Sequence, residues 1–233
     1  MTAHDITNED LARLRPRRMQ YAMENLETYR STLEAQQIPS GLLDTPPYEP
    51  QYTVAGCMPA CYNMIFNAIA QNSLRAPNQV ALTSLTKYGG CRFDEDVLLQ
   101  SLSTAHFRQK TGKLVTSKVL IGADFDDIAR RAALVKQKRR DASVYATVGI
   151  KNFDSDYGEG LHGVVLLGVT EDTVSFHNPY PRKHHRGSSC SMLSTDGCGA
   201  FDTLDKAEFI ERWAVGMHEA RLVIARSDPS YTG

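Results

Sequence analysis

The sequence predicts an α+β fold in which helices come first and an antiparallel sheet follows. The clearest helical pattern is an apolar run directly after Cys57, in the first third of the chain. Short β-branched segments come later, at 143–150, 163–169 and 174–176. Because only a few residues separate the last two segments, we expect them to form an antiparallel hairpin.

Size and charge exclude several classes of protein. A chain of 233 residues that is 42% hydrophobic buries a substantial single core. Its net charge of -1 gives no bulk attraction to nucleic acid or to anionic lipid, so neither is an expected partner. No apolar run approaches the roughly 20 residues that span a bilayer, and we expect no membrane insertion.

Cysteine usage and the N-terminus favour a cytoplasmic protein. The five cysteines form no compact repeating pattern, which suits a reducing compartment with a free thiol better than a disulfide framework. The N-terminus is rich in Asp, Glu and Arg and does not have the basic and then apolar pattern of a signal peptide. Export without a cleavable signal, as a secreted effector, remains the alternative.

The chain divides into three parts. Residues 1–50 form an N-terminal helical extension, with a helix from about 7 to 36, followed by a proline-rich connector. This helix is expected to pack on the domain, and a removable inhibitory segment is the alternative. Residues 51–226 form the main domain, and residues 227–233 are expected to be a flexible tail. Within the domain, Asp124 caps a helix at about 128–140, a further helix covers about 204–213, and a strand covers 220–225.

Cys57 begins the helix that we expect at the centre of the domain. Pro59 favours a helix start at this point, and apolar side chains then recur with few charges on any face, to about residue 72. The N–H groups and the dipole at a helix N-terminus stabilise a thiolate, the nucleophilic form of cysteine. Cys57 is therefore a candidate nucleophile.

Three polar residues supply what such a nucleophile needs. His162 opens an apolar strand and is the candidate base. Asn178 ends the partner strand of the predicted hairpin, where it can orient the histidine. The side chain of Gln51, with the Cys57 backbone N–H, can bind the oxyanion that forms when a thiolate attacks an acyl carbon.

These residues resemble a known family. Gln51, six residues before Cys57, with Pro59-Ala60-Cys61, is similar to the Gln…Cys-Gly-Pro-Ala block of papain-like cysteine peptidases of the C39 and C39-like group. The strand that opens with His162 and the later Asn178-Pro179 are similar in order to the family's histidine and Asp-Pro or Asn-Pro motifs. The resemblance implies a papain-like fold, in which the helix that carries the nucleophilic cysteine packs on an antiparallel sheet. It also implies Cys57 as nucleophile, His162 as base, Asn178 as orienter and Gln51 as oxyanion donor.

Two features distinguish this chain from the family pattern. Met58 stands where the family usually has glycine, which raises the question whether its side chain blocks the cleft. No transporter segments follow the domain, so the leader-exporting role of the founding members is not implied.

Other cysteines and histidines offer competing sites. Cys61 lies one turn after Cys57 and is a rival nucleophile, although a buried core thiol is the better interpretation. Five further histidines and cysteines could in principle bind a metal, namely His177, His184, His185, Cys190 and Cys198. Their spacing fits no compact zinc pattern, so no metal or other cofactor is expected. A disulfide between Cys190 and Cys198 would require export.

The sequence therefore predicts a cysteine hydrolase that acts on a peptide or protein substrate. Deamidation or acyl transfer by the same site is an alternative, and so is an inactive papain-like binding module. Specificity is expected to lie in residues 149–161, in residues 73–119 and in the N-terminal helix.

Overall fold

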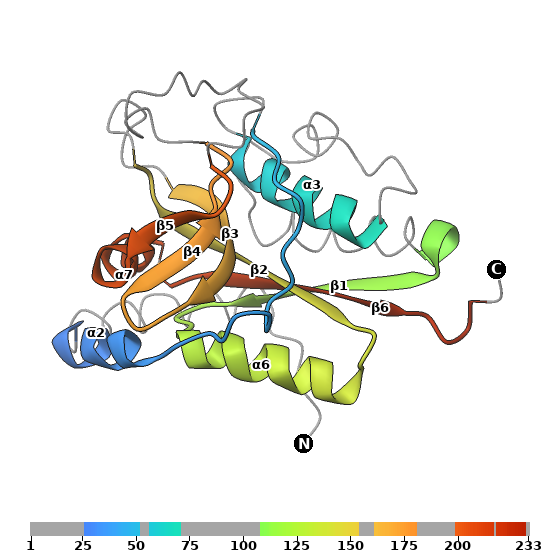
Figure 1. The fold of residues 1–233 in the computed structure, drawn as a ribbon, viewed down its shortest axis with the longest axis horizontal. Coiled ribbons are helices and arrows are strands. Elements are labelled where there is room, and N and C mark those ends of the chain that lie inside the picture. Colours follow the sequence, from blue (N-terminus) through green and yellow to red (C-terminus); the bar gives the residue numbers. More distant parts are fainter. Residues whose placement is uncertain are drawn as a thin grey trace, which may run out of the picture.

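A computed structural model describes residues 26–51, 56–70, 108–153, 161–180, 199–216 and 218–231. Six strands in these ranges form one sheet in the order β1-β6-β2-β3-β4-β5, with every neighbouring pair antiparallel (Figure 1). The predicted α+β class with an antiparallel sheet is therefore confirmed. The elements are α2 Leu26–Ala35, α3 Cys57–Ala70, β1 Lys113–Leu120, α6 Phe125–Lys138, β2 Ser143–Lys151, β3 Leu161–Val169, β4 Thr173–His177, β5 Asp202–Asp205, α7 Lys206–Val215 and β6 Ala220–Ser227.

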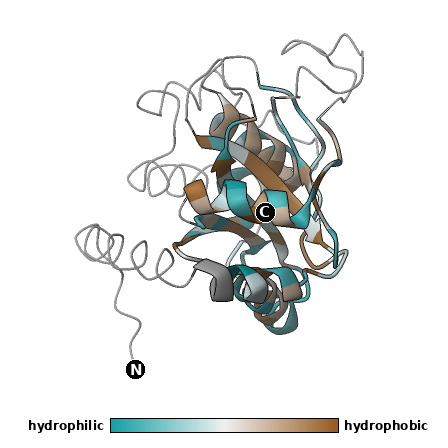
Figure 2. Ribbon diagram, turned by 90° about the vertical axis from the view of Figure 1, so that its left-hand side faces the viewer, coloured by the Kyte–Doolittle hydropathy of each residue, from teal (hydrophilic) through white to brown (hydrophobic). Residues whose placement is uncertain are grey.

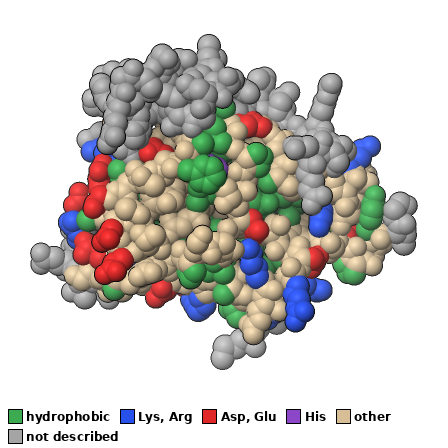
Figure 3. All heavy atoms as spheres, viewed as in Figure 1, with side chains coloured by type: hydrophobic (Ala, Val, Ile, Leu, Met, Phe, Trp, Pro, Cys, Tyr) green, Lys and Arg blue, Asp and Glu red, His purple; other side chains and the backbone are tan. Residues whose placement is uncertain are grey.

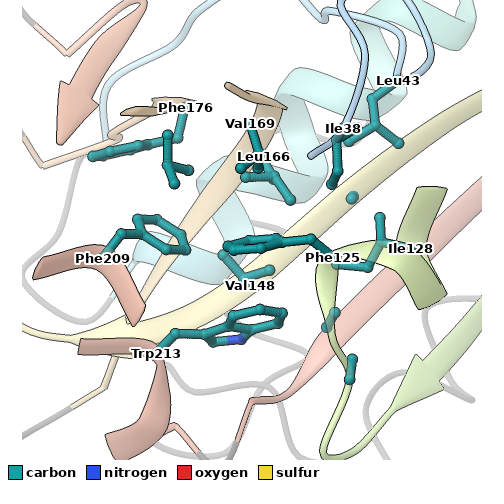
Figure 4. Packing of buried hydrophobic residues seen from close by; sticks show 14 of the residues in the cluster. Ile38, Leu43, Phe125, Ile128, Val148, Leu166, Val169, Phe176, Phe209 and Trp213 are labelled. Carbon is teal, nitrogen blue, oxygen red and sulfur yellow. The ribbon is translucent and has the colours of Figure 1, made fainter. Parts of the chain in front are cut away.

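The main core lies on the sheet face that is covered by α6 and α7. Because successive side chains of a strand point to opposite faces, alternate residues of β2 such as Val148 join this core. The rings of Phe125 and Trp213 stack with their centroids 5.1 Å apart, and Phe209 packs beside them (Figure 4). Figure 2 shows hydrophobic residues concentrated in the sheet.

Helix α3 packs on the opposite face of the sheet, against β3 and β2 (Figure 1). Its residues Tyr62, Ile65 and Phe66 form a second cluster with the remaining alternate side chains of the sheet, among them Tyr145 and Val223. Almost the whole helix is buried, as the lack of charge in its sequence predicts. The sheet therefore holds α3 in a fixed position.

The N-terminal segment is tied into the main core in residues 26–51. Arg30 of α2 forms an ion pair of 2.8 Å with Glu211 of α7, and the buried Leu33 belongs to the main cluster. Ile38 pairs with Val169 at the end of β3, through N–H to carbonyl bonds of 3.0 Å and 3.2 Å. Helix α2 lies near α7, on the other face of the sheet from α3 (Figure 1). The rest of the predicted helix, residues 7–25, lies outside the described residues.

Several predicted elements appear as expected. Asp124 caps α6, accepting the backbone N–H of Asp127, and the hairpin of β3 and β4 is present. The sequence also indicates a helix at about 94–103, and this segment lies outside the described residues. Part of the expected tail is anchored, since Asp228 is buried and its carboxylate lies 2.7 Å from Arg108 Nε. No helix in the described part of the chain has the length and apolarity to cross a membrane.

Candidate active site

Cys57 is the first residue of α3, as the sequence predicts. The helix begins with a hydrogen bond of 2.9 Å from the Ala60 N–H to the Gly56 carbonyl. The first turn contains no acidic side chain, so no carboxylate offsets the positive end of the helix dipole. Cys57 is half-buried and is a free thiol.

His162 is the second residue of β3, and its side chain reaches the Cys57 thiol. Burial of the thiol opposes its ionisation, but three other contacts outweigh that effect and the pKa of Cys57 is lowered. The largest of these is the hydrogen bond and charge of the His162 side chain, followed by the backbone N–H groups of Gly163 and Met58. The thiolate is therefore favoured at the position where the sequence predicts a nucleophile.

Asn178 contacts His162 from the neighbouring strand, with 2.8 Å between His162 Nε2 and Asn178 Oδ1. The register pairs Val165 with His177, so one further step places Asn178 opposite Val164 and makes His162 its diagonal neighbour. The hairpin therefore brings together the two residues that the sequence predicts as base and orienter.

The hydrogen bonds of Asn178 determine which nitrogen of His162 carries a proton. The Tyr180 N–H donates to Asn178 Oδ1 at 3.1 Å, which identifies this atom as the amide oxygen. An amide oxygen only accepts, so His162 Nε2 must be the donor in the contact between the two side chains. The other ring nitrogen, Nδ1, is then the one that can exchange a proton with the Cys57 thiol.

The backbone of Asn178 is held equally firmly. Its N–H donates to the Gly199 carbonyl at 2.8 Å, and its carbonyl accepts the Tyr48 hydroxyl at 3.2 Å. A Cβ at Gly199 would collide with the Asn178 carbonyl oxygen and the Tyr48 hydroxyl. Glycine is therefore required at 199 for this close approach.

Gln51 lies next to the Asn178-Pro179 segment. It is buried, and its backbone N–H donates to the Pro179 carbonyl at 2.8 Å, one residue after Asn178. Just before it, the Glu49 carboxylate accepts hydrogen bonds from the side chains of Asn63 and Asn67 on α3. The connector is thereby fixed to both halves of the site, on β4 and on α3. Residues 52–55, between Gln51 and the helix, lie outside the described residues.

Met58 is packed between α3 and the sheet. It is only 7% exposed, it belongs to the cluster with Tyr62 and Tyr145, and its sulfur lies over Gly163. The Met58 side chain therefore fills the space beside Gly163 of β3. It does not project into solvent, where it could block a cleft. Cys61, the rival nucleophile, is fully buried among core side chains such as Val165, as expected of a structural thiol.

His177, considered above as a metal ligand, has both ring nitrogens engaged by the backbone. Nε2 lies 3.0 Å from the Pro46 carbonyl, and Nδ1 accepts the Phe201 N–H at 3.1 Å. Burial lowers the pKa of His177 although the bond to Pro46 raises it, so the ring is held neutral. The other four residues of that set lie outside the described residues, and the described ranges contain no group of three side chains suited to a metal.

No family model and no curated protein matches this chain. Among solved structures, it is similar to a chain from Bacillus anthracis that is described as a candidate C39-like peptidase. The two share 13% sequence identity over 82% of this chain and 99% of the other, with a TM-score of 0.47. So weak a likeness carries no argument, and the chemistry follows from the residues described above.

Two contacts of the site were not predicted. The Tyr180 N–H bonds the Asn178 side chain two residues earlier, which is an Asx turn, and the Asn-Pro pair is a sequence signal for it. The other is Asp202, whose carboxylate accepts Asn178 Nδ2 at 3.3 Å. A lone aspartate between Phe201 and Thr203 carries no such signal, because its place is set only by the pairing of β5 with β4.

Proposed function

We propose that this protein is a papain-like cysteine hydrolase of the C39-like type, which forms an acyl-enzyme on Cys57. One observation carries the proposal, namely the continuous contact from the Cys57 thiol through His162 to Asn178. The order of these residues along the chain is also the order in the family that the sequence resembles. Cys57 lies at the start of a buried helix, His162 lies on β3 and Asn178 directly follows β4, so packed elements of the fold hold all three residues in place.

In the first step, the Cys57 thiolate attacks the acyl carbon of a peptide or amide bond. The carbonyl oxygen becomes an oxyanion, which the Cys57 backbone N–H and the Gln51 side chain are proposed to bind. The proton on His162 Nδ1 passes to the leaving nitrogen as the C–N bond breaks. The products of this step are the free amine and a thioester on Cys57.

In the second step, water attacks the thioester and gives a proton to the same His162 nitrogen. The C–S bond then breaks, releasing the carboxylic acid and restoring the thiolate and imidazolium pair. Throughout both steps the proton on His162 Nε2 stays bonded to Asn178 Oδ1, so the ring keeps its orientation. Acyl transfer differs only in the acceptor that replaces water, and deamidation only in the amide that is attacked.

The first test measures the reactivity of Cys57. We expect iodoacetamide at pH 7 to alkylate Cys57 faster than Cys61, with a rate that falls about ten-fold or more in His162→Ala, because fewer thiolates are present. Peptide mass spectrometry after timed quenching gives both rates in one sample. Cys61→Ala is the matched control, because it removes a thiol from the same helix and should leave the rate at Cys57 unchanged.

The second test asks whether the reactive thiol hydrolyses amides. Phe201, the residue before β5, is 66% exposed and its ring contacts that of His177 next to Asn178. Figure 3 shows hydrophobic side chains exposed on this face of the molecule. A library of fluorogenic peptide amides should therefore include aromatic and aliphatic residues next to the scissile bond. Turnover by the wild type and none by Cys57→Ala supports the proposal. An alkylation rate at Cys57 that is unchanged in His162→Ala, with no turnover of any peptide amide, would instead favour the binding module.

A further inference from the structure

Asp202 is a buried carboxylate beside the proposed catalytic residues. It is only 7% exposed and is the first residue of β5, where it pairs with Phe176 of β4. Residues that pair across antiparallel strands share a face of the sheet. Asn178 comes two residues after Phe176, so it lies on the same face as Phe176 and Asp202. Burial of a carboxylate is costly unless hydrogen bonds compensate it, so its partners matter.

The two oxygens of Asp202 have different partners. Oδ1 accepts the Thr203 N–H at 2.9 Å, and Oδ2 accepts Asn178 Nδ2 at 3.3 Å. The Asn178 amide is therefore bonded at both ends, since its oxygen accepts from His162 and from the Tyr180 N–H. A carboxylate can only accept here, so it favours the orientation in which the NH₂ group faces β5 and the oxygen faces His162.

We propose that Asp202 is a positioning residue of this site, which holds the Asn178 amide so that His162 keeps its proton on Nε2. The inference rests on the proposed function for its chemical purpose. If the amide turned over, its NH₂ group would face His162 Nε2, and the ring would have to place its proton on Nδ1. His162 would then have no free nitrogen to accept the proton of Cys57.

An exchange of the two side chains tests the proposal. In Asp202→Asn, an NH₂ group replaces one of the two carboxylate oxygens, so either Asn178 Nδ2 or the Thr203 N–H faces a donor in place of its acceptor. In Asn178→Asp, two carboxylates face each other. In the double variant the amide at 202 donates to the carboxylate at 178, while its oxygen still accepts Thr203, so every donor again meets an acceptor.

We expect each single variant to slow alkylation of Cys57 about ten-fold, the scale on which outer hydrogen-bond partners act. The double variant should recover to within about three-fold of the wild type, because substitutions of contacting residues are not additive. Asp205→Asn is the matched control, since it removes a carboxylate from the other end of β5 and should not change the rate. A double variant as slow as the slower single variant would overturn the proposal.

A second measurement separates this inference from the proposed function. Nitrogen NMR of histidine-labelled Cys57→Ala protein at pH 8 reports the tautomer of His162 without any turnover, and His162→Ala assigns the signal. We expect the proton on Nε2, and a population with the proton on Nδ1 once Asp202→Ala is added. An unchanged tautomer would refute the role of Asp202 and leave the hydrolase proposal standing. A changed tautomer in a protein that cleaves no amide would support the role of Asp202 and refute the hydrolase proposal.

Discussion

Acid should destabilise this protein through His218, and the size of the effect follows from the structure. His218 is 4% exposed and its ring lies 4.9 Å from that of Trp213, measured between centroids. Burial lowers its pKa from 6.5 to about 4, because the charged ring would have to leave water. The folded protein therefore keeps this side chain neutral where the unfolded chain protonates it.

The sign and magnitude follow by linkage. Between pH 6.5 and about 4 the unfolded chain binds more protons than the folded chain, so stability falls as the pH falls through this range. At about 1.4 kcal/mol per pH unit, the full loss by pH 4 is about 3 kcal/mol, and the loss at pH 5 is about 2 kcal/mol. Above pH 7 both states are neutral at this position and the effect disappears.

His218→Asn isolates this contribution from those of other titrating groups. Asparagine tolerates the positive φ of 49° at this position and does not titrate. Without the contact to Trp213, the variant should be less stable than the wild type at pH 8. At pH 5 the difference should shrink or reverse, by about 2 kcal/mol, because only the wild type pays to keep the histidine neutral.

Urea unfolding at pH 8 and pH 5 measures the two differences. The chain has one tryptophan, Trp213, and it is fully buried, so its fluorescence reports the loss of the core that surrounds His218. Circular dichroism on the same samples checks that unfolding is two-state. His177 also has a lowered pKa, but it is present in both proteins and cancels. A difference that stays constant within about 0.5 kcal/mol would refute the reasoning.

Three further substitutions test the framework of the site. Lys206→Met should lower the free energy of unfolding by about 3 kcal/mol in urea titrations, because its buried ammonium bonds three backbone carbonyls; Lys206→Arg should lose less. Gly199→Ala should cost about 2 kcal/mol through its clash with the Asn178 carbonyl and should slow alkylation of Cys57; a normal rate would contradict the proposed role of Asn178. Gly163→Ala should lower the free energy of unfolding by about 1 to 3 kcal/mol, because its Cβ meets the Met58 side chain. In thermal unfolding, adding Met58→Ala should recover part of that loss, whereas additive losses would contradict the contact between these two residues.

The elements that were predictable carry their signals locally. Helix α6 has a capping aspartate, acidic residues in its first turn and basic residues in its last, and the hairpin has β-branched strands with a polar turn. Strand β1 was not predicted, because Lys113 and Lys118 interrupt its pattern as is typical of an edge strand. Strand β5 has four residues, too few for a periodic signal. The two strands that were not predicted are thus those that form only because they pair with a neighbouring strand of the sheet.

The same division applies within the site. Cys57, His162 and Asn178 were predictable because each stands at the end of an element with a clear signal, and the hairpin register then forces the last two together. Asp202 was not, because its position depends on the pairing of β5.

Met58 shows why a departure from a family motif needs the structure before it can be interpreted. A larger side chain after the nucleophile suggests a blocked cleft only if it points toward solvent. On the first turn of α3 it points to the sheet instead, and β3 has glycine at the position beneath it. Gly163 also supplies one of the N–H groups that lower the pKa of Cys57, and a β3 side chain there would collide with the Met58 side chain. The methionine and the glycine therefore pack as a pair directly beside the thiol, and the larger side chain after the nucleophile is accommodated by the smaller residue on the strand.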